Sequence, residues 1–183
     1  MAKLSAWSLW FGSVVALFGT VVFASGNAAL PKHLEQRELT NPAIVTAWLK
    51  ANAATADKVL ANQFFERALK DKERGAWGPA GKGFCESALF YPTPSALSEC
   101  ANAVTRSLGS TRAREKSFSK YSRGDMQRIE SLYRSAIAAD VVLDTLSAKK
   151  KKEARQNADC LAAFVRAEKM QPDCQPLQAY GLK

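Results

Sequence analysis

Apolar residues recur along most of this chain at the spacing of amphipathic α-helices. Positions 44, 45, 48 and 49 lie on one helical face, and Asn41-Pro42 before them supplies an N-cap followed by proline at the first helical position. The most regular stripe runs from Ile129 to Val141, within a helix expected from Gly124-Asp125 to about Leu146. No segment alternates strictly between apolar and polar residues, as a half-buried strand would. The pattern therefore predicts an all-α domain of about five helices.

Three other segments have a helical stripe, and glycine-rich stretches separate them. The stripes cover residues 58–72, where Thr55 is the expected cap, residues 95–108, where Ser95 is the expected cap, and residues 154–169. Gly109 is expected to end the second of these helices. Residues 75–83 (GAWGPAGKG) contain four glycines and a proline, which predicts a turn-rich connector, followed by an ordered loop over residues 84–94.

The N-terminus has the composition of an export signal. Residues 1–24 contain one base, no acid, an apolar run from Leu4 to Phe23, and Val22-Phe23-Ala24, a sequence that a signal peptidase can cleave. The alternative is an uncleaved membrane anchor, since twenty helical residues span about 30 Å. Residues 25–40 are predicted to be a linker and residues 41–183 a helical periplasmic domain. The sequence thus predicts a periplasmic or secreted protein, or one anchored in the inner membrane and facing the periplasm.

Cysteine usage agrees with export. The chain has four cysteines, Cys85, Cys100, Cys160 and Cys174, and an even number in a translocated protein indicates two disulfides. Proximity in sequence favours the pairs Cys85–Cys100 and Cys160–Cys174, and a Cys100–Cys160 bridge is the alternative. With one histidine and no Cys-x-x-Cys, the sequence predicts no metal site, and it predicts no cofactor.

The positive charge gathers in two stretches of the chain, residues 106–128 and residues 149–152. Lysine and arginine number 26 against 17 acidic residues, a net charge of +9. Since an exported protein rarely meets nucleic acid, the expected partner is an acidic envelope protein or an anionic membrane or lipopolysaccharide surface. A solvated face without a ligand is the alternative. The predicted binding surface consists of Arg106, Arg112, Arg114, Lys116, Lys120, Arg123 and Arg128, together with Trp77.

No complete catalytic signature is present. The expected function is therefore non-enzymatic: a binding, inhibitory or assembly module, or an accessory subunit of a membrane complex if the leader is retained. In being basic, helical and exported, the chain resembles lysozyme-like peptidoglycan-cleaving enzymes, which often carry a catalytic Glu followed by Ser. Glu86-Ser87 and Glu130-Ser131 match that dipeptide, but the usual downstream Gly-Leu-Met-Gln is absent. The resemblance implies Glu86 or Glu130 as a general acid whose pKa an apolar pocket raises.

Overall fold

The computed structural model describes residues 33–115, 118–167, 171 and 173–182. Within these residues the protein is all-helical, without strands. None of the described helices combines the length and the apolar character that crossing a membrane requires. The elements are a short 3-10 helix at Glu38–Thr40, then α1 (Pro42–Asn52), α2 (Lys58–Glu73), α3 (Trp77–Phe90), α4 (Pro94–Glu115), α5 (Phe118–Leu143), α6 (Ala148–Ala167) and α7 (Gln175–Tyr180).

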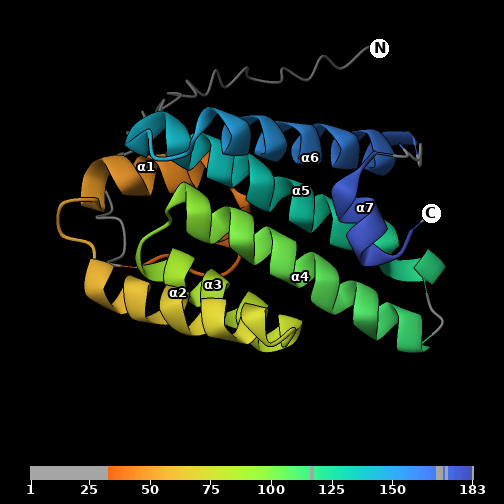
Figure 1. Ribbon diagram of the computed structural model, residues 1–183. Coiled ribbons are helices and arrows are strands. Elements are labelled where there is room, and N and C mark those ends of the chain that lie inside the picture. Colours follow the sequence, from red (N-terminus) through yellow and green to blue (C-terminus); the bar gives the residue numbers. More distant parts are fainter. Residues whose placement is uncertain (1–32, 116–117, 168–170, 172, 183) are drawn as a thin grey trace, which may run out of the picture.

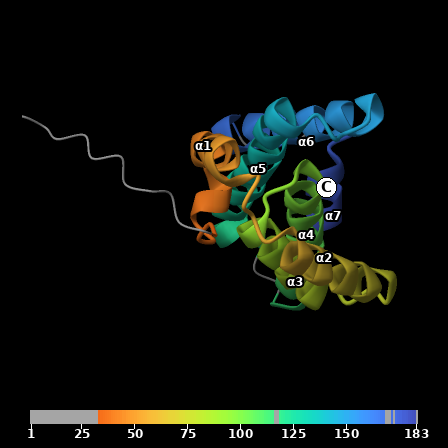
Figure 2. The ribbon, with the colours of Figure 1, turned by 90° about the vertical axis from the view of Figure 1, so that its left-hand side faces the viewer.

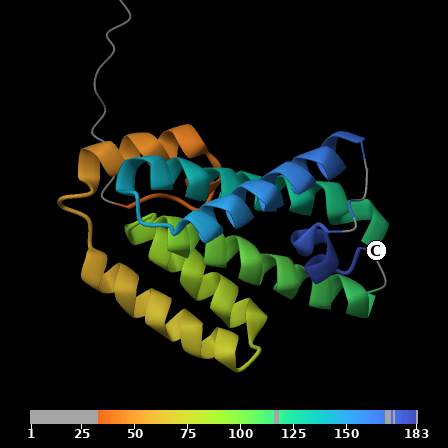
Figure 3. The same cartoon turned by 45° about the horizontal axis from the view of Figure 1, so that its top comes forward.

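The long helices pack as antiparallel neighbours in chain order, and α4 lies in the middle (Figure 1). In the view turned by 90°, α2 and α3 form one side of the molecule, while α1, α5 and α6 form the other (Figure 2). The short α7 lies against α4 near the end opposite the α1–α2 turn (Figure 3). This arrangement brings residues from six helices to one region between α4, α6 and α7.

The core contains most of the predicted helical stripes. Ile129, Tyr133 and Ala136 of α5 are at most 2% exposed, as the spacing predicted. Two residues of the expected stripes point outward instead: Val59 is 71% exposed and Val141 is 80% exposed. Both lie within helices whose other apolar positions cover the inward face. The fold class predicted from the sequence is confirmed, with seven α-helices in the described residues rather than about five.

Polar side chains cap the N-termini of α1, α2, α4 and α6 in the described residues. The Asn41 side chain accepts hydrogen bonds from the backbone N–H groups of Ala43 and Ile44, so the predicted start of α1 is confirmed. The prediction for α2 was wrong by two residues, because Asp57 caps it rather than Thr55. Thr93 caps α4 in the same way, where Ser95 was expected.

The glycine-rich stretch 75–83 is helical from Trp77 onward, so the predicted connector and the loop after it are wrong. The cause is tertiary packing. A Cβ atom added at Gly83 would lie 2.9 Å from Cβ of Ala68 on α2, and one at Gly81 would lie 3.3 Å from the backbone nitrogen of Val104 on α4. Glycine therefore lets α3 approach both neighbours closely, at the cost of lower helix propensity.

Glycine does not end α4 or begin α5 either, contrary to prediction. Helix α4 continues past Gly109 to Glu115, because α7 packs onto the glycine: an added Cβ would lie 2.6 Å from the carbonyl oxygen of Tyr180. Helix α5 begins at Phe118, before Gly124, and ends at Leu143 rather than Leu146. In both helices the surrounding packing outweighs the local preference of glycine for turns.

The end of the predicted linker 25–40 is packed against the domain. Leu34 and Leu39 are each 1% exposed, and the backbone N–H of Leu34 donates to the carbonyl oxygen of Leu89 at 2.8 Å. Residues 25–32 lie outside the described residues, as do the predicted signal peptide and its alternative, the anchor. The folded domain therefore begins earlier than residue 41.

Both disulfides form with the pairing favoured by the sequence. Cys85–Cys100 joins α3 to α4, and Cys160–Cys174 joins α6 to the residue before α7. None of these cysteines is more than 6% exposed. Disulfides form and persist in oxidising compartments, so the domain has the covalent chemistry of an exported protein.

A buried carboxylate organises the turn between α5 and α6. Asp140 accepts the backbone N–H groups of Thr145 at 3.0 Å and Leu146 at 2.8 Å, and its other oxygen lies 3.0 Å from Nζ of Lys151. Burial acts to raise the pKa of Asp140, but these hydrogen bonds and Lys151 outweigh it and hold the pKa below its usual value. The adjacent Asp144 adopts φ of 47°, a left-handed conformation that aspartate tolerates better than most residues.

We expect Asp140→Asn to make the domain less stable at neutral pH, with a difference that disappears in acid. A carboxylate whose pKa is lowered by folding stabilises the protein above its unfolded pKa of about 3.9 and loses this contribution as pH falls through the folded value. Thermal unfolding of both proteins at a series of pH values measures the difference. A difference that stays constant down to about pH 2 would contradict this role of the ionised group.

Candidate functional site

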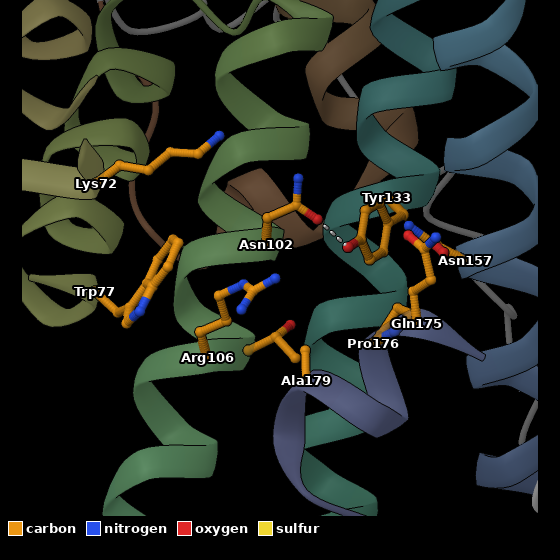
Figure 4. Close-up of a pocket in the computed structure, with 10 residues that line it drawn as sticks. Lys72, Trp77, Asn102, Arg106, Tyr133, Asn157, Gln175, Pro176 and Ala179 are labelled. Carbon is orange, nitrogen blue, oxygen red and sulfur yellow. Dashed lines mark hydrogen bonds between the residues drawn. The ribbon is translucent and has the colours of Figure 1, made fainter. Parts of the chain in front are cut away.

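A polar pocket of about 200 Å³ opens where α4 meets α6 and α7 (Figure 4). The end of α2 and the start of α3 form one wall, and α4 and α5 form the floor. Among the residues that the structure describes, two cationic side chains and no acidic one line it. The lining residues are Lys72, Trp77, Asn102, Thr105, Arg106, Tyr133, Asn157, Gln175, Pro176 and Ala179.

Trp77 and Arg106 face each other across the mouth of the pocket. The guanidinium carbon of Arg106 lies 4.7 Å from the centroid of the Trp77 ring, within the range of a cation–π contact. The indole thus holds the guanidinium in place, and an arginine placed in this way keeps N–H donors available for a planar acceptor such as a carboxylate. Sequence analysis had proposed both residues, and the structure brings them together.

Tyr133 and Asn102 set the polarity of the floor. The Tyr133 hydroxyl donates to Oδ1 of Asn102 at 2.6 Å (Figure 4). Burial raises the pKa of Tyr133 far above its usual value, and a hydrogen bond with the Asn157 side chain opposes this rise only in part. The phenol is therefore neutral at any physiological pH and remains a donor. Oδ1 of Asn102 accepts this hydrogen bond, and the NH₂ group of the same side chain can donate to another acceptor.

Lys72 connects this pocket to a second, smaller one. Its Nζ lies 2.7 Å from Oε2 of Glu99, which lines the second pocket, of about 80 Å³. The two pockets share three lining residues, Asn102, Tyr133 and Asn157. We call them together the double pocket. The second part is of mixed charge, since Glu99, Glu153 and Lys150 all line it.

The two other predicted basic residues whose side chains are described, Arg123 and Arg128, do not line the double pocket. Arg123 donates to the carbonyl oxygen of Val165 at 2.9 Å, on the side of α6. Arg128 is exposed on α5. Lys116 lies outside the described residues, and the side chains of Arg112, Arg114 and Lys120 are likewise not described. Of the four proposed surface residues whose side chains are described, Arg106 and Trp77 line the pocket.

The two glutamates proposed as alternative catalytic acids lie on other surfaces. The carboxylate of Glu130, which is partly buried on α5, accepts a hydrogen bond from Nε of Arg134 at 2.8 Å. Glu86 on α3 has a side chain that is 32% exposed, and it lies 3.8 Å from Nζ of Lys82. Neither carboxylate lines the double pocket.

Most of the polar lining was not found by sequence analysis. Asn102, Asn157 and Gln175 come from three different helices and share no local motif. The predicted Cys160–Cys174 disulfide offered one indirect signal. Gln175 directly follows Cys174, and Asn157 lies three residues before Cys160, so the bridge brings these two residues near each other.

The comparisons with known proteins returned no match: no family model, no curated protein and no solved structure is similar to this chain.

Proposed function

We propose that this chain is an exported, non-enzymatic binding module of the cell envelope that holds an acidic protein partner at the surface around Arg106 and Trp77. The observation that carries the proposal is the pocket lined by Lys72 and Arg106, with no acidic side chain among its described lining residues. A solvent-exposed site lined by cations attracts anionic groups. This attraction raises the association rate and the specificity for an acidic partner. The module would act by occupying its partner, as an inhibitor or an assembly factor does.

Export to the periplasm is part of this proposal. The N-terminal apolar run and the two disulfides favour it together, because the bridges need an oxidising compartment after the chain has crossed the membrane. If the leader is cleaved, the domain acts as a free periplasmic or secreted protein. If it is retained, the module is an accessory subunit of an inner-membrane complex.

A protein partner is favoured over a lipid or lipopolysaccharide surface by the shape of the site. The donors converge on a recess of about 200 Å³, which fits one projecting group. An anionic membrane surface instead binds best to cations that are spread over a flat or convex face of a protein. Glu99 and Glu153 in the adjoining pocket would also repel the negative headgroups of a lipid surface.

Reversing the charge at the pocket should release the partner. We expect Arg106→Glu to reduce capture of the partner from envelope extracts by about tenfold or more, and raised salt to weaken capture by the unchanged protein. The matched control is Lys149→Glu, which reverses one base whose side chain is 86% exposed on α6. Capture that survives both Arg106→Glu and high salt would contradict the proposal, as would loss of peptidoglycan-cleaving activity in Glu86→Gln or Glu130→Gln.

A further inference from the structure

The double pocket differs in charge from one end to the other. Its larger part is lined by Lys72 and Arg106 and by no acid, whereas its smaller part is lined by Glu99, Glu153 and Lys150. A ligand that is negative along its whole length would meet repulsion in the smaller part. The arrangement suits a chain with one anionic group followed by an uncharged neighbour, as in a peptide.

The side chains on the shared wall are suited to a peptide backbone. Asn102, held by Tyr133, presents an NH₂ donor, and Asn157, which also lines both parts, carries an amide with donor and acceptor groups. Gln175 adds a further amide to the larger part alone. A peptide backbone likewise offers one N–H and one C=O for each residue. Amide side chains that line both pockets can therefore pair with the backbone that joins one ligand residue to the next.

The volumes of the two pocket parts limit which ligand residue can follow the charged residue. The larger part, about 200 Å³, has room for an acidic side chain or a chain terminus beside the Trp77 ring. The smaller part, about 80 Å³, is less than half the size of the larger part, so it suits a small side chain such as that of alanine or serine better than an aromatic ring.

Resting on the proposed function, we infer that the double pocket binds an extended peptide segment of the partner, with one carboxylate at Arg106 and a small neighbouring residue beside Glu99. The guanidinium of Arg106 contributes a forked pair of N–H donors that matches the two oxygens of a carboxylate. The carboxylate comes from an acidic side chain or from the C-terminus of the segment, and both sources present the same planar group.

Synthetic peptides test this inference without knowledge of the partner. The probes are acetyl-Ala-Glu-Ala-amide for a side-chain carboxylate, acetyl-Ala-Ala-Ala with a free C-terminus, acetyl-Ala-Ala-Ala-amide, acetyl-Trp-Glu-Trp-amide and inorganic phosphate. Binding is followed on the ¹⁵N-labelled protein, purified as the cell produces it, through the indole N–H signal of Trp77. Trp48 serves as the internal reference, since it is fully buried.

We expect one or both of the alanine-flanked carboxylate peptides to shift the Trp77 signal in a saturable way. The neutral amide should not shift it, and the tryptophan-flanked peptide should bind several-fold more weakly. Arg106→Gln should raise the dissociation constant about tenfold or more, because hydrogen bonds to charged groups are lost. Lys149→Gln, the matched control, should leave it within about twofold.

Three results would overturn the inference: equal binding of the neutral amide, binding of phosphate as tight as that of the carboxylate peptides, or no saturable shift with any peptide. Each of these can occur while Arg106→Glu still abolishes capture of the partner, in which case the proposed function stands and the peptide inference fails. The reverse pattern, in which carboxylate peptides bind while capture does not depend on Arg106, would reject the proposed function and leave the carboxylate site in place.

Discussion

Removing the Cys160–Cys174 disulfide by a double change to alanine should release α7 and abolish binding at the double pocket. Helix α7 has six residues, which is too few for a stable helix in isolation. The bridge closes a loop of about 14 residues, so its loss costs about 3 kcal/mol on the chain-entropy estimate. Since Gln175, Pro176 and Ala179 line the pocket, its wall should be lost with the helix.

Two measurements separate a local effect from a global one. Amide hydrogen exchange should rise first in α7, and the Trp77 signal should no longer respond to the carboxylate peptides. The comparison variant carries both Cys85→Ala and Cys100→Ala. It removes the bridge between α3 and α4, which closes a loop of similar length. Buried Phe84, Ala88 and Leu97 hold those two helices together, so this variant should lose stability globally and still bind peptide. Equal loss of binding in both variants would contradict the special role of α7.

Gly109→Ala should also displace α7, although alanine is the better helix former. The added methyl group would lie 2.6 Å from the carbonyl oxygen of Tyr180 and 2.8 Å from that of Ala179, and both are backbone atoms that cannot rotate away. Overpacking of this kind costs roughly 1–3 kcal/mol. The same helix is otherwise held by the hydroxyl of Tyr180, which donates to Asp125 at 2.6 Å. Thermal unfolding should show a lower midpoint, and the affinity for carboxylate peptides should fall.

Gly124→Ala is the matched control for this change. Gly124 lies within α5, and an added Cβ there meets no atom within 4 Å. Alanine should therefore stabilise the protein by about 0.5–1 kcal/mol through helix propensity alone. Opposite signs for the same substitution at two helical glycines would establish close packing as the cause. If Gly109→Ala is also stabilising, α7 does not press on α4 as described.

Segments with their own amphipathic stripe and their own cap were predictable from sequence. For α1 both the Asn41-Pro42 start and the buried Val45, Trp48 and Leu49 were anticipated, because capping and periodicity depend on residues within one or two turns. The disulfide pairing was also anticipated, since cysteines 14 and 15 residues apart meet when the helices between them form hairpins.

The candidate site was predictable only in part. Trp77 and Arg106 drew attention as an aromatic residue and a base, but nothing local indicated that they would meet. Asn102, Asn157 and Gln175 are ordinary polar residues in helices, where exposure to solvent is the usual expectation. Their role depends on where α4, α6 and α7 lie relative to one another.

By itself, the sequence determined that the chain is helical and basic, and it favoured pairing of the cysteines with near neighbours, because periodicity, composition and loop closure can be read over short stretches of the chain. The tertiary structure alone decided that the glycines at 81, 83 and 109 lie within helices, and that two cations, a tryptophan and three amides share one pocket. A glycine has the same local preference for turns wherever it stands in a sequence. Only the closeness of a neighbouring backbone, such as that of Tyr180 at Gly109, makes the missing side chain an advantage within a helix.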